Sequence, residues 1–402
     1  MRLEHGLGIA SDVLAFPGEV TDCYPLADGE CAHCYGKSLS VFDLNEPNVA
    51  CSEPSWQSYL DEASQLEAFG QVSGVVAPGT HMRSEIFDQW RTLTLPIPDQ
   101  QTGEKVLELL GERQLILVTG AGGAGLVARQ IAFFLRTQTN YRALAVSASE
   151  LAAYEGFAEY AILFALSQSG ETADTLCAIE AAQGWGMPNL SLVNVPYSTM
   201  TRHADLFIQL GAGPEHCVLS TKSATAQIAF GYWLSGLLCG DSCKPTDTLQ
   251  GLGSALTNEL TEDVFEQFSD VVEYLFERSS VFLLGKGLYH ASAELAALNL
   301  KEATYIHAEA FCAGDLKHGV IALIESGTPV ILFGLGEDPY MDGVAAELKS
   351  RGAKIIAIGS EQGNLSLPVF AGGHPVTVQI TCQILAYLLA LRRAVDPDRP
   401  GN

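Results

Sequence analysis

Positive charge is scarce in this chain: 22 Lys and Arg residues stand against 47 Asp and Glu, a net charge of −25 over 402 residues. A surface this acidic repels phosphate backbones and anionic lipid headgroups. General nucleic-acid binding and membrane-surface binding are therefore excluded. A small phosphorylated ligand is not excluded, because a few backbone amides and hydroxyls can hold one locally.

Long apolar runs are also absent. The longest, around Ala229–Gly240 and Ile384–Leu391, are too short to span a bilayer and are interpreted as buried helices. No basic region followed by an apolar stretch opens the chain, so no secretory signal is expected. The ten cysteines are scattered rather than densely spaced, which fits a reducing cytoplasm. We expect a cytoplasmic protein.

Cys31, His33 and Cys34 are the one group that suggests a zinc site. Their neighbours predict a strand, on which Cys31 and His33 share a face while Cys34 points away. This geometry chelates a metal poorly, so we expect no metal and no cofactor.

The predicted secondary structure changes along the chain. Residues 1–100 are irregular, with strand-like pieces at Gly8–Ala15 and Ser38–Phe42 and helical patterns at Trp56–Phe69 and Arg83–Trp90. Short apolar strands then alternate with helices, which is typical of a parallel α/β sheet. The expected strands are Gln114–Thr119, Arg142–Val146, Tyr160–Leu166, Asn189–Val193 and Leu206–Leu210, then Ser280–Leu284, Pro329–Phe333, Lys354–Ile358 and Leu367–Phe370. The expected long helices are Ala224–Leu238, Ala291–Tyr305 and Val376–Arg393.

The two strand–helix units resemble each other. Each begins with an apolar strand, at Gln114 or Ser280, followed by a glycine turn and an alanine-rich helix. This indicates an internal duplication about 165 residues apart. We therefore predict an α/β protein with two doubly wound parallel-sheet domains of three layers, αβα. The expected boundaries are 1–100 for an irregular N-terminal region, 101–245 for the first domain and 246–402 for the second.

The segment Ser167-Gln-Ser-Gly-Glu-Thr172 follows a buried strand and precedes a helix at Ala173–Gln183. Open α/β sheets bind ligands at the carboxyl ends of their strands. Three hydroxyls and free helix amides at that point favour an anion such as phosphate. Helix capping is the alternative, although one cap needs only one hydroxyl.

Two further segments have competing interpretations. Gly120–Gly125 fits G-x-G-x-x-G after a strand, but no acidic residue closes the next strand, so a tight turn explains it better than dinucleotide binding. Ser220–Thr225 precedes a long helix, and capping is the simpler explanation of its hydroxyls.

Glu302 and His318 are candidate proton-transfer residues. Glu302 stands near the end of an otherwise apolar helix, where partial burial would raise its proton affinity toward neutrality. His318 precedes Gly319 in a loop and titrates in the same range. A structural ion pair for Glu302 and a satisfied loop imidazole for His318 are the alternatives.

Three long motifs, at residues 167–176, 220–222 and 301–319, occur in the order found in glutamine–fructose-6-phosphate aminotransferases, and the chain resembles the isomerase half of that family. The resemblance implies two sugar-isomerase (SIS) domains and, near the N-terminus, only the last fragment of a glutaminase domain. It implies a homodimer whose sugar-phosphate site is formed by Ser167, Gln168, Ser169, Thr172, Ser220 and Gly122. Glu302 would be the base between C1 and C2 of the sugar, and His318 of a neighbouring subunit would help open the ring.

The chain departs from the family pattern near this site. Gly120-Ala-Gly122 replaces a Gly-Thr-Ser turn, Asn299 replaces a lysine, and the chain ends at Asn402, before the family's lysine-bearing tail. Two hypotheses follow. The first is a glutamine-independent enzyme that isomerises hexose or hexosamine 6-phosphates with amination or deamination. The second is a catalytically reduced phosphosugar sensor, or a partner of a complete synthase.

Overall fold

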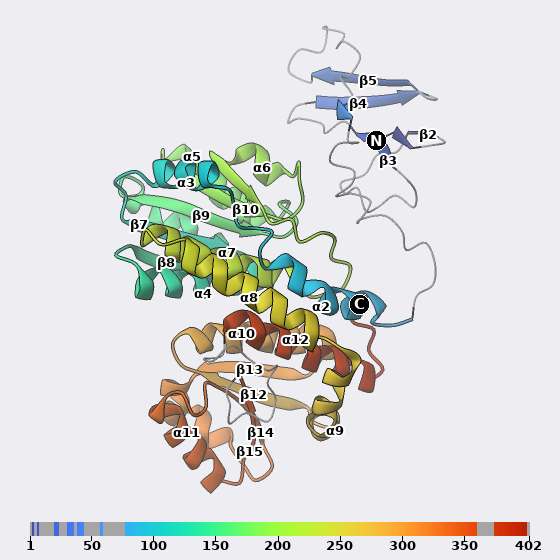
Figure 1. The fold of residues 1–402 in the computed structure, drawn as a ribbon, viewed down its shortest axis with the longest axis vertical. Helices are drawn as coiled ribbons and strands as arrows, with labels where there is room; N and C mark the ends of the chain where they lie inside the picture. Colours follow the sequence, from blue (N-terminus) through green and yellow to red (C-terminus); the bar gives the residue numbers. More distant parts are fainter. Residues whose placement is uncertain are drawn as a thin grey trace. The chain divides into compact units, whose positions relative to one another are not determined.

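The computed structural model describes residues 2–3, 6–7, 20–23, 30–35, 38–43, 57–58, 77–359 and 374–399 (Figure 1). The chain divides into two units, Met1–Ala77 and Pro78–Asn402. In the first unit, β1 (Arg2–Leu3), β2 (Gly6–Leu7), β3 (Val20–Cys23) and β6 (Gln57–Ser58) form an antiparallel sheet, and β4 (Glu30–Tyr35) pairs with β5 (Ser38–Asp43).

The sequence predictions for this first unit are partly confirmed. The strand expected at Ser38–Phe42 is present as β5, and Cys31 and His33 lie on strand β4. The helix expected over Trp56–Phe69 is wrong at Gln57–Ser58, because these residues pair with β3 and a distant strand overrides the local pattern. The rest of that helix and the strand at Gly8–Ala15 lie outside the described residues. Within the described residues, no three His, Cys, Asp or Glu side chains are grouped to hold a metal.

The second unit contains two parallel sheets. The first has the order β11-β10-β9-β7-β8 and the second the order β13-β12-β14-β15. The strands of the first sheet are β7 (Leu115–Gly120), β8 (Arg142–Ser147), β9 (Ala161–Ser167), β10 (Asn189–Val193) and β11 (Leu206–Gln209). Those of the second are β12 (Ser280–Gly285), β13 (His307–Cys312), β14 (Pro329–Phe333) and β15 (Lys354–Ile358). The helices are α2 (Thr80–Thr92), α3 (Gln100–Leu110), α4 (Gly122–Gln138), α5 (Ala173–Gly184), α6 (Thr199–His203), α7 (Lys222–Leu238), α8 (Cys243–Glu259), α9 (Ser269–Phe276), α10 (Leu288–Thr304), α11 (Pro339–Ser350) and α12 (Pro375–Arg392).

Both sheets are covered on both faces, which confirms the three-layer prediction. Successive residues of β7 point to opposite sides: Val118 packs in the core with α4 and α7, and Leu117 packs with α5. In the second sheet, Leu283 packs in the same core as Val118, and Leu284 packs on the opposite face against α11. The strand expected at Leu367–Phe370 lies outside the described residues.

The internal duplication is confirmed by matching positions. In both sheets the first strand lies between the second and the third. Gly122 and Gly287 are 165 residues apart, and both adopt positive φ, 55° and 60°, immediately before or at the start of a helix. Arg129 of α4 and Glu294 of α10, again 165 residues apart, form an ion pair across the two domains. The two halves therefore face each other through equivalent helices.

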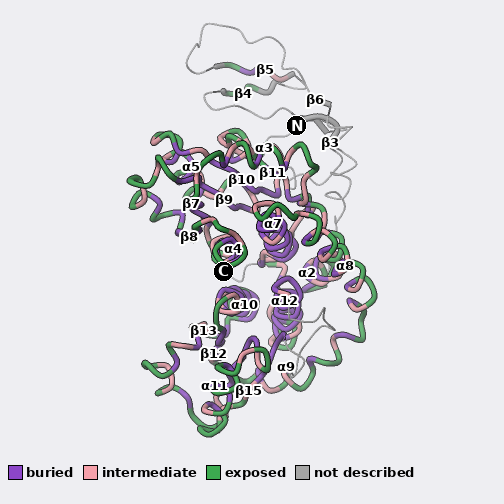
Figure 2. The backbone as a smooth tube through the Cα atoms, turned by 60° about the vertical axis from the view of Figure 1, so that its left-hand side comes forward, coloured by how far each residue is buried: buried purple, intermediate pink, exposed green. Residues whose placement is uncertain are grey.

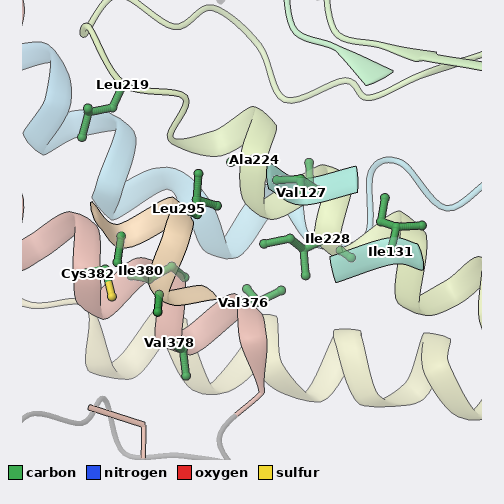
Figure 3. Packing of buried hydrophobic residues seen from close by; sticks show 14 of the residues in the cluster. Val127, Ile131, Leu219, Ala224, Ile228, Leu295, Val376, Val378, Ile380 and Cys382 are labelled. Carbon is green, nitrogen blue, oxygen red and sulfur yellow. The ribbon is translucent and has the colours of Figure 1, made fainter. Parts of the chain in front are cut away.

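One apolar core joins the two domains. It includes Val127 and Ile131 of α4, Ile228 of α7, Leu295 of α10 and Ile380 of α12 (Figure 3). Figure 2 shows the buried backbone concentrated in these inner helices and in the strands. By length and composition α12 would suit a membrane span, but most of it is buried inside this core.

The Arg129–Glu294 pair gives a test of how the domains face each other. Arg129→Glu places two carboxylates together and is expected to lower the free energy of unfolding by about 1 kcal/mol, since partly exposed pairs contribute modestly. Thermal unfolding at low salt measures this. The charge swap Arg129→Glu with Glu294→Arg should restore stability. A charge-swap variant that is no more stable than Arg129→Glu alone would contradict the pairing.

Candidate functional site

A crevice is expected where the strand order of the first sheet reverses. The chain runs from β7 to β8 on one side and returns to β9 on the other, and ligands bind outside the carboxyl ends of strands at such a point. Thr119 lies opposite Ala165, so the turn at Gly120–Gly122 and the loop at Ser167–Thr172 leave the sheet side by side. The structure thus brings together two of the three predicted segments.

Ser220 reaches the same turn from the N-terminus of α7. A Cβ atom placed on Gly123 would lie 3.4 Å from Ser220 Oγ and 3.8 Å from Leu295 Cδ1. A Cβ atom on Gly122 would meet nothing within 4 Å. Gly123 therefore lies against Ser220, and the position of a side chain at Gly122 is open space.

Two serine hydroxyls of the Ser167–Thr172 loop accept backbone N–H groups of the same loop. Ser167 Oγ accepts the Gly170 N–H at 2.9 Å, and Ser169 Oγ accepts the Glu171 N–H at 3.1 Å. Each hydroxyl therefore keeps its own proton for another acceptor. Thr172, at the start of α5, makes no side-chain cap. Helix capping therefore does not use Thr172, and the loop presents protons and helix amides that suit an anion.

Hydrogen bonds to the start of α6 hold the Ser167–Thr172 loop in place. Glu171 Oε1 accepts the Thr199 N–H at 2.7 Å, and the Gly170 carbonyl accepts the Met200 N–H at 3.0 Å. Gly170 is buried with φ of 70°, and its Cα hydrogens face Ser198 so closely that a Cβ would lie 2.1 Å from Ser198 Oγ. Only glycine fits this position.

The hydroxyls of Ser220–Thr225 do not cap α7, contrary to the simpler interpretation. Glu215 does so: its Oε1 accepts the backbone N–H groups of Thr221 and Ser223, both at 2.8 Å. Sequence reasoning missed Glu215, which precedes the helix by seven residues. The Ser220 hydroxyl is thereby left out of the cap.

Glu302 lies in the last turn of α10, which packs antiparallel to α4. Gly123, at the start of α4, approaches Leu295, while Phe133, farther along α4, approaches Gly287 at the start of α10. The C-terminal end of α10 therefore points the same way as the N-terminal end of α4. Glu302 follows Leu295 by seven residues, so it lies on the same helix face about 10 Å farther on.

The surroundings of Glu302 adjust its acidity. The residue is exposed on a single chain, yet neighbouring protein atoms partly desolvate its carboxylate and raise its pKa to about 7. The Lys301 charge opposes this rise only in part. One turn earlier, Asn299 is buried and its Nδ2 has no hydrogen-bond partner. A carboxylate with this pKa can accept and return a proton near neutrality.

His318 is not brought to Glu302 within one chain. It ends the 3₁₀ turn Ala313–His318 after β13, and it is exposed. Glu302 precedes β13, and the six residues of that strand span about 20 Å between them. The two predicted proton-transfer residues thus lie at opposite ends of the strand.

The second domain lacks the hydroxyl loop at the equivalent position. After β14, a Cβ on Gly334 would lie 2.7 Å from the ring of Tyr289, whose hydroxyl donates to Glu337 at 2.9 Å. Lys286 Nζ lies 2.6 Å from Asp338 Oδ2. At this position Tyr289 contacts Glu337 and Lys286 contacts Asp338, so the two domains differ in the side chains that they present there.

This fold defines a class. A family model described as the SIS domain matches residues 109–235 and 274–366, that is, both parallel-sheet domains. The curated isomerising glutamine–fructose-6-phosphate aminotransferases of Aeropyrum pernix and Bacillus licheniformis are 30% and 32% identical to the chain, over 98% of its length and 67% of theirs. The chain belongs to this aminotransferase family and spans about two thirds of the length of these relatives.

Solved structures agree on the fold. The C-terminal domain of glucosamine-fructose-6-phosphate aminotransferase from Francisella tularensis superposes with a TM-score of 0.71 at 24% identity, covering 82% of this chain and all of that one. Glucosamine-6-phosphate deaminase from Thermotoga maritima superposes with a TM-score of 0.65 at 23% identity, covering 80% of this chain and 98% of that one. Both confirm the two-domain SIS architecture.

Proposed function

We propose that the first SIS domain, residues 101–245, binds a hexose or hexosamine 6-phosphate in the crevice between β7 and β9. The observation that carries this proposal is the Ser167–Thr172 loop, whose serine hydroxyls accept backbone N–H groups and so keep their protons for a phosphate. The phosphate ligands would be Ser167, Gln168, Ser169 and Thr172, with Ser220 and the backbone at Gly122 lining the sugar. The second SIS domain, residues 246–402, would supply Glu302.

The proposed reaction is aldose–ketose isomerisation with deamination or amination. Glu302, with a pKa of about 7, takes the C2 proton of open-chain glucosamine 6-phosphate and returns a proton to C1. The C1 oxygen gains a proton and the C2 amine loses one as the aldehyde becomes an alcohol and the amine becomes an imine. Water then adds to the C2 imine and ammonia leaves, which gives fructose 6-phosphate. The reverse direction consumes ammonia, and neither direction needs glutamine.

We further propose a cytoplasmic homodimer. The support is the separation of Glu302 from His318 along β13, since ring opening beside the base would then need His318 of a second copy. Sedimentation in the presence of ligand tests the dimer.

Incubation with glucosamine 6-phosphate in deuterated water tests the activity. The expected result is ammonia, fructose 6-phosphate and deuterium at the exchanging carbon. Binding without exchange or turnover would favour the alternative, a phosphosugar sensor or a partner of a complete synthase. No binding at all would overturn the proposal.

A further inference from the structure

Two carboxylates meet beneath the segment that carries Ser220. Glu85, on α2, is only 4% exposed, and Glu215 belongs to the segment itself. The Thr221 hydroxyl lies between them, 2.5 Å from Glu85 Oε2 and 3.1 Å from Glu215 Oε1. Glu85 is buried, Glu215 is partly buried, and one hydroxyl bridges them, so two full negative charges would repel each other and the pair should hold one proton.

The donors around each carboxylate indicate where that proton is. Glu85 Oε1 accepts the backbone N–H groups of His216 and Cys217, at 2.6 and 3.2 Å. Its Oε2 faces the hydroxyl of Thr221 and the thiol of Cys217. Glu85 Oε2 therefore has two neighbours that can donate, one of them a thiol that is a weak acceptor, and this favours Glu85 as the charged partner.

Glu215 is surrounded differently. Its Oε1 accepts two backbone N–H groups, but Oε2 faces only the Ser223 hydroxyl, at 2.5 Å, which can accept as well as donate. Burial of the carboxylate, and then the nearby Glu85 charge, raise the pKa of Glu215. Among the described residues, Lys222 forms no ion pair with either glutamate, and its Nζ lies 3.9 Å from Asp88 Oδ2.

We propose that Glu85, ionised, and Glu215, protonated, are positioning residues that fix Ser220 at the sugar-phosphate site. They hold the chain on both sides of Ser220, at residues 216–217 and 221–223, while Gln383 Nε2 donates to the Thr221 carbonyl at 3.2 Å. This inference rests on the proposed function for the role of Ser220, but the proton assignment does not.

Glutamine variants test the assignment. In Glu85→Gln, one carboxylate oxygen becomes an amide N–H₂ group, which faces the donors that this oxygen used to accept. Those buried donors lose their acceptor, the segment that carries Ser220 shifts, and binding of glucosamine 6-phosphate should weaken about tenfold. Glu215→Gln keeps an acceptor for the two N–H groups and a donor for Ser223, so the loss should be smaller. Glu108→Gln, exposed on α3, is the matched control. Equal losses in both variants, or a larger loss for Glu215→Gln, would overturn the proton assignment.

A double-mutant cycle separates positioning from general destabilisation. If Glu85 acts through Ser220, Ser220→Ala should reduce affinity much less in the Glu85→Gln background than in the wild type. Additive losses would leave Glu85 a merely structural role and contradict the proposal.

Infrared spectroscopy tests the proton without ligand. In a Glu302→Gln background, which removes the carboxyl whose pKa is raised to about 7, the carbonyl stretch of a protonated carboxylic acid should be present near neutral pH and should be lost when Glu215→Gln is added. Its persistence in Glu215→Gln would place the proton elsewhere. If this band behaves as expected while the wild type binds no sugar phosphate, the proposed function fails and the proton assignment stands.

Discussion

Glu302→Gln is expected to lower turnover of glucosamine 6-phosphate by about 10²- to 10⁴-fold, the usual contribution of a general base. Glutamine keeps the shape of the side chain but cannot accept the C2 proton. Affinity for the sugar phosphate should change little, because the phosphate loop belongs to the other domain. Ammonia release and deuterium incorporation measure turnover, and calorimetry measures affinity.

The pH profile gives the same hypothesis a second readout. The carboxylate is the active form, and its pKa of about 7 places the change near neutrality. Turnover should therefore fall about tenfold for each pH unit below 7 and level off above it. Glu302→Gln should lose this acid limb from its residual activity. Glu273→Gln, on the exposed α9 pair with Arg392, is the control. A Glu302→Gln variant with wild-type turnover would remove the proposed base.

Much of the fold could be predicted because buried parallel strands are nearly continuous apolar runs. Strands β10, β14 and β15 have the predicted bounds, and β9 is shifted by one residue. Strand β13 was missed for a physical reason. It lies at a sheet edge, where His307 stays exposed, so the apolar run that marks a central strand is lacking.

The site was less accessible to sequence reasoning. The position of Ser167–Thr172 after a buried strand predicts a ligand loop, with helix capping as the alternative explanation of its hydroxyls. The hydrogen bonds of Ser167 and Ser169 go to Gly170 and Glu171, which precede α5, so these two hydroxyls do not cap that helix. Glu85 could not be connected to Thr221, because 136 residues separate them and no local pattern joins them. The wide separation of Glu302 and His318 likewise follows only from the topology of β13.

Gly170→Ala is expected to abolish sugar-phosphate binding while leaving the rest of the second unit folded. A side chain at φ of 70° costs about 1–2 kcal/mol, and overpacking adds about 1–3 kcal/mol. The new Cβ would lie 2.1 Å from Ser198 Oγ and 2.9 Å from Val193 Cγ2. Because the Gly170 carbonyl also accepts the Met200 N–H, relief of the clash must displace the loop whose hydroxyls we propose as the phosphate ligands. Calorimetry with glucosamine 6-phosphate measures the loss, and thermal unfolding monitors the fold.

Two companion variants separate the clash from a general effect of alanine. Gly184→Ala, in the last turn of α5 where a Cβ meets nothing within 4 Å, should bind normally and unfold no earlier than the wild type. Adding Ser198→Gly to Gly170→Ala removes the two closest contacts but not the positive φ, so it should recover part of the affinity. Full binding by Gly170→Ala alone would mean that the loop tolerates displacement. The arrangement of hydroxyl donors from Ser167 to Thr172 would then not be what holds the phosphate.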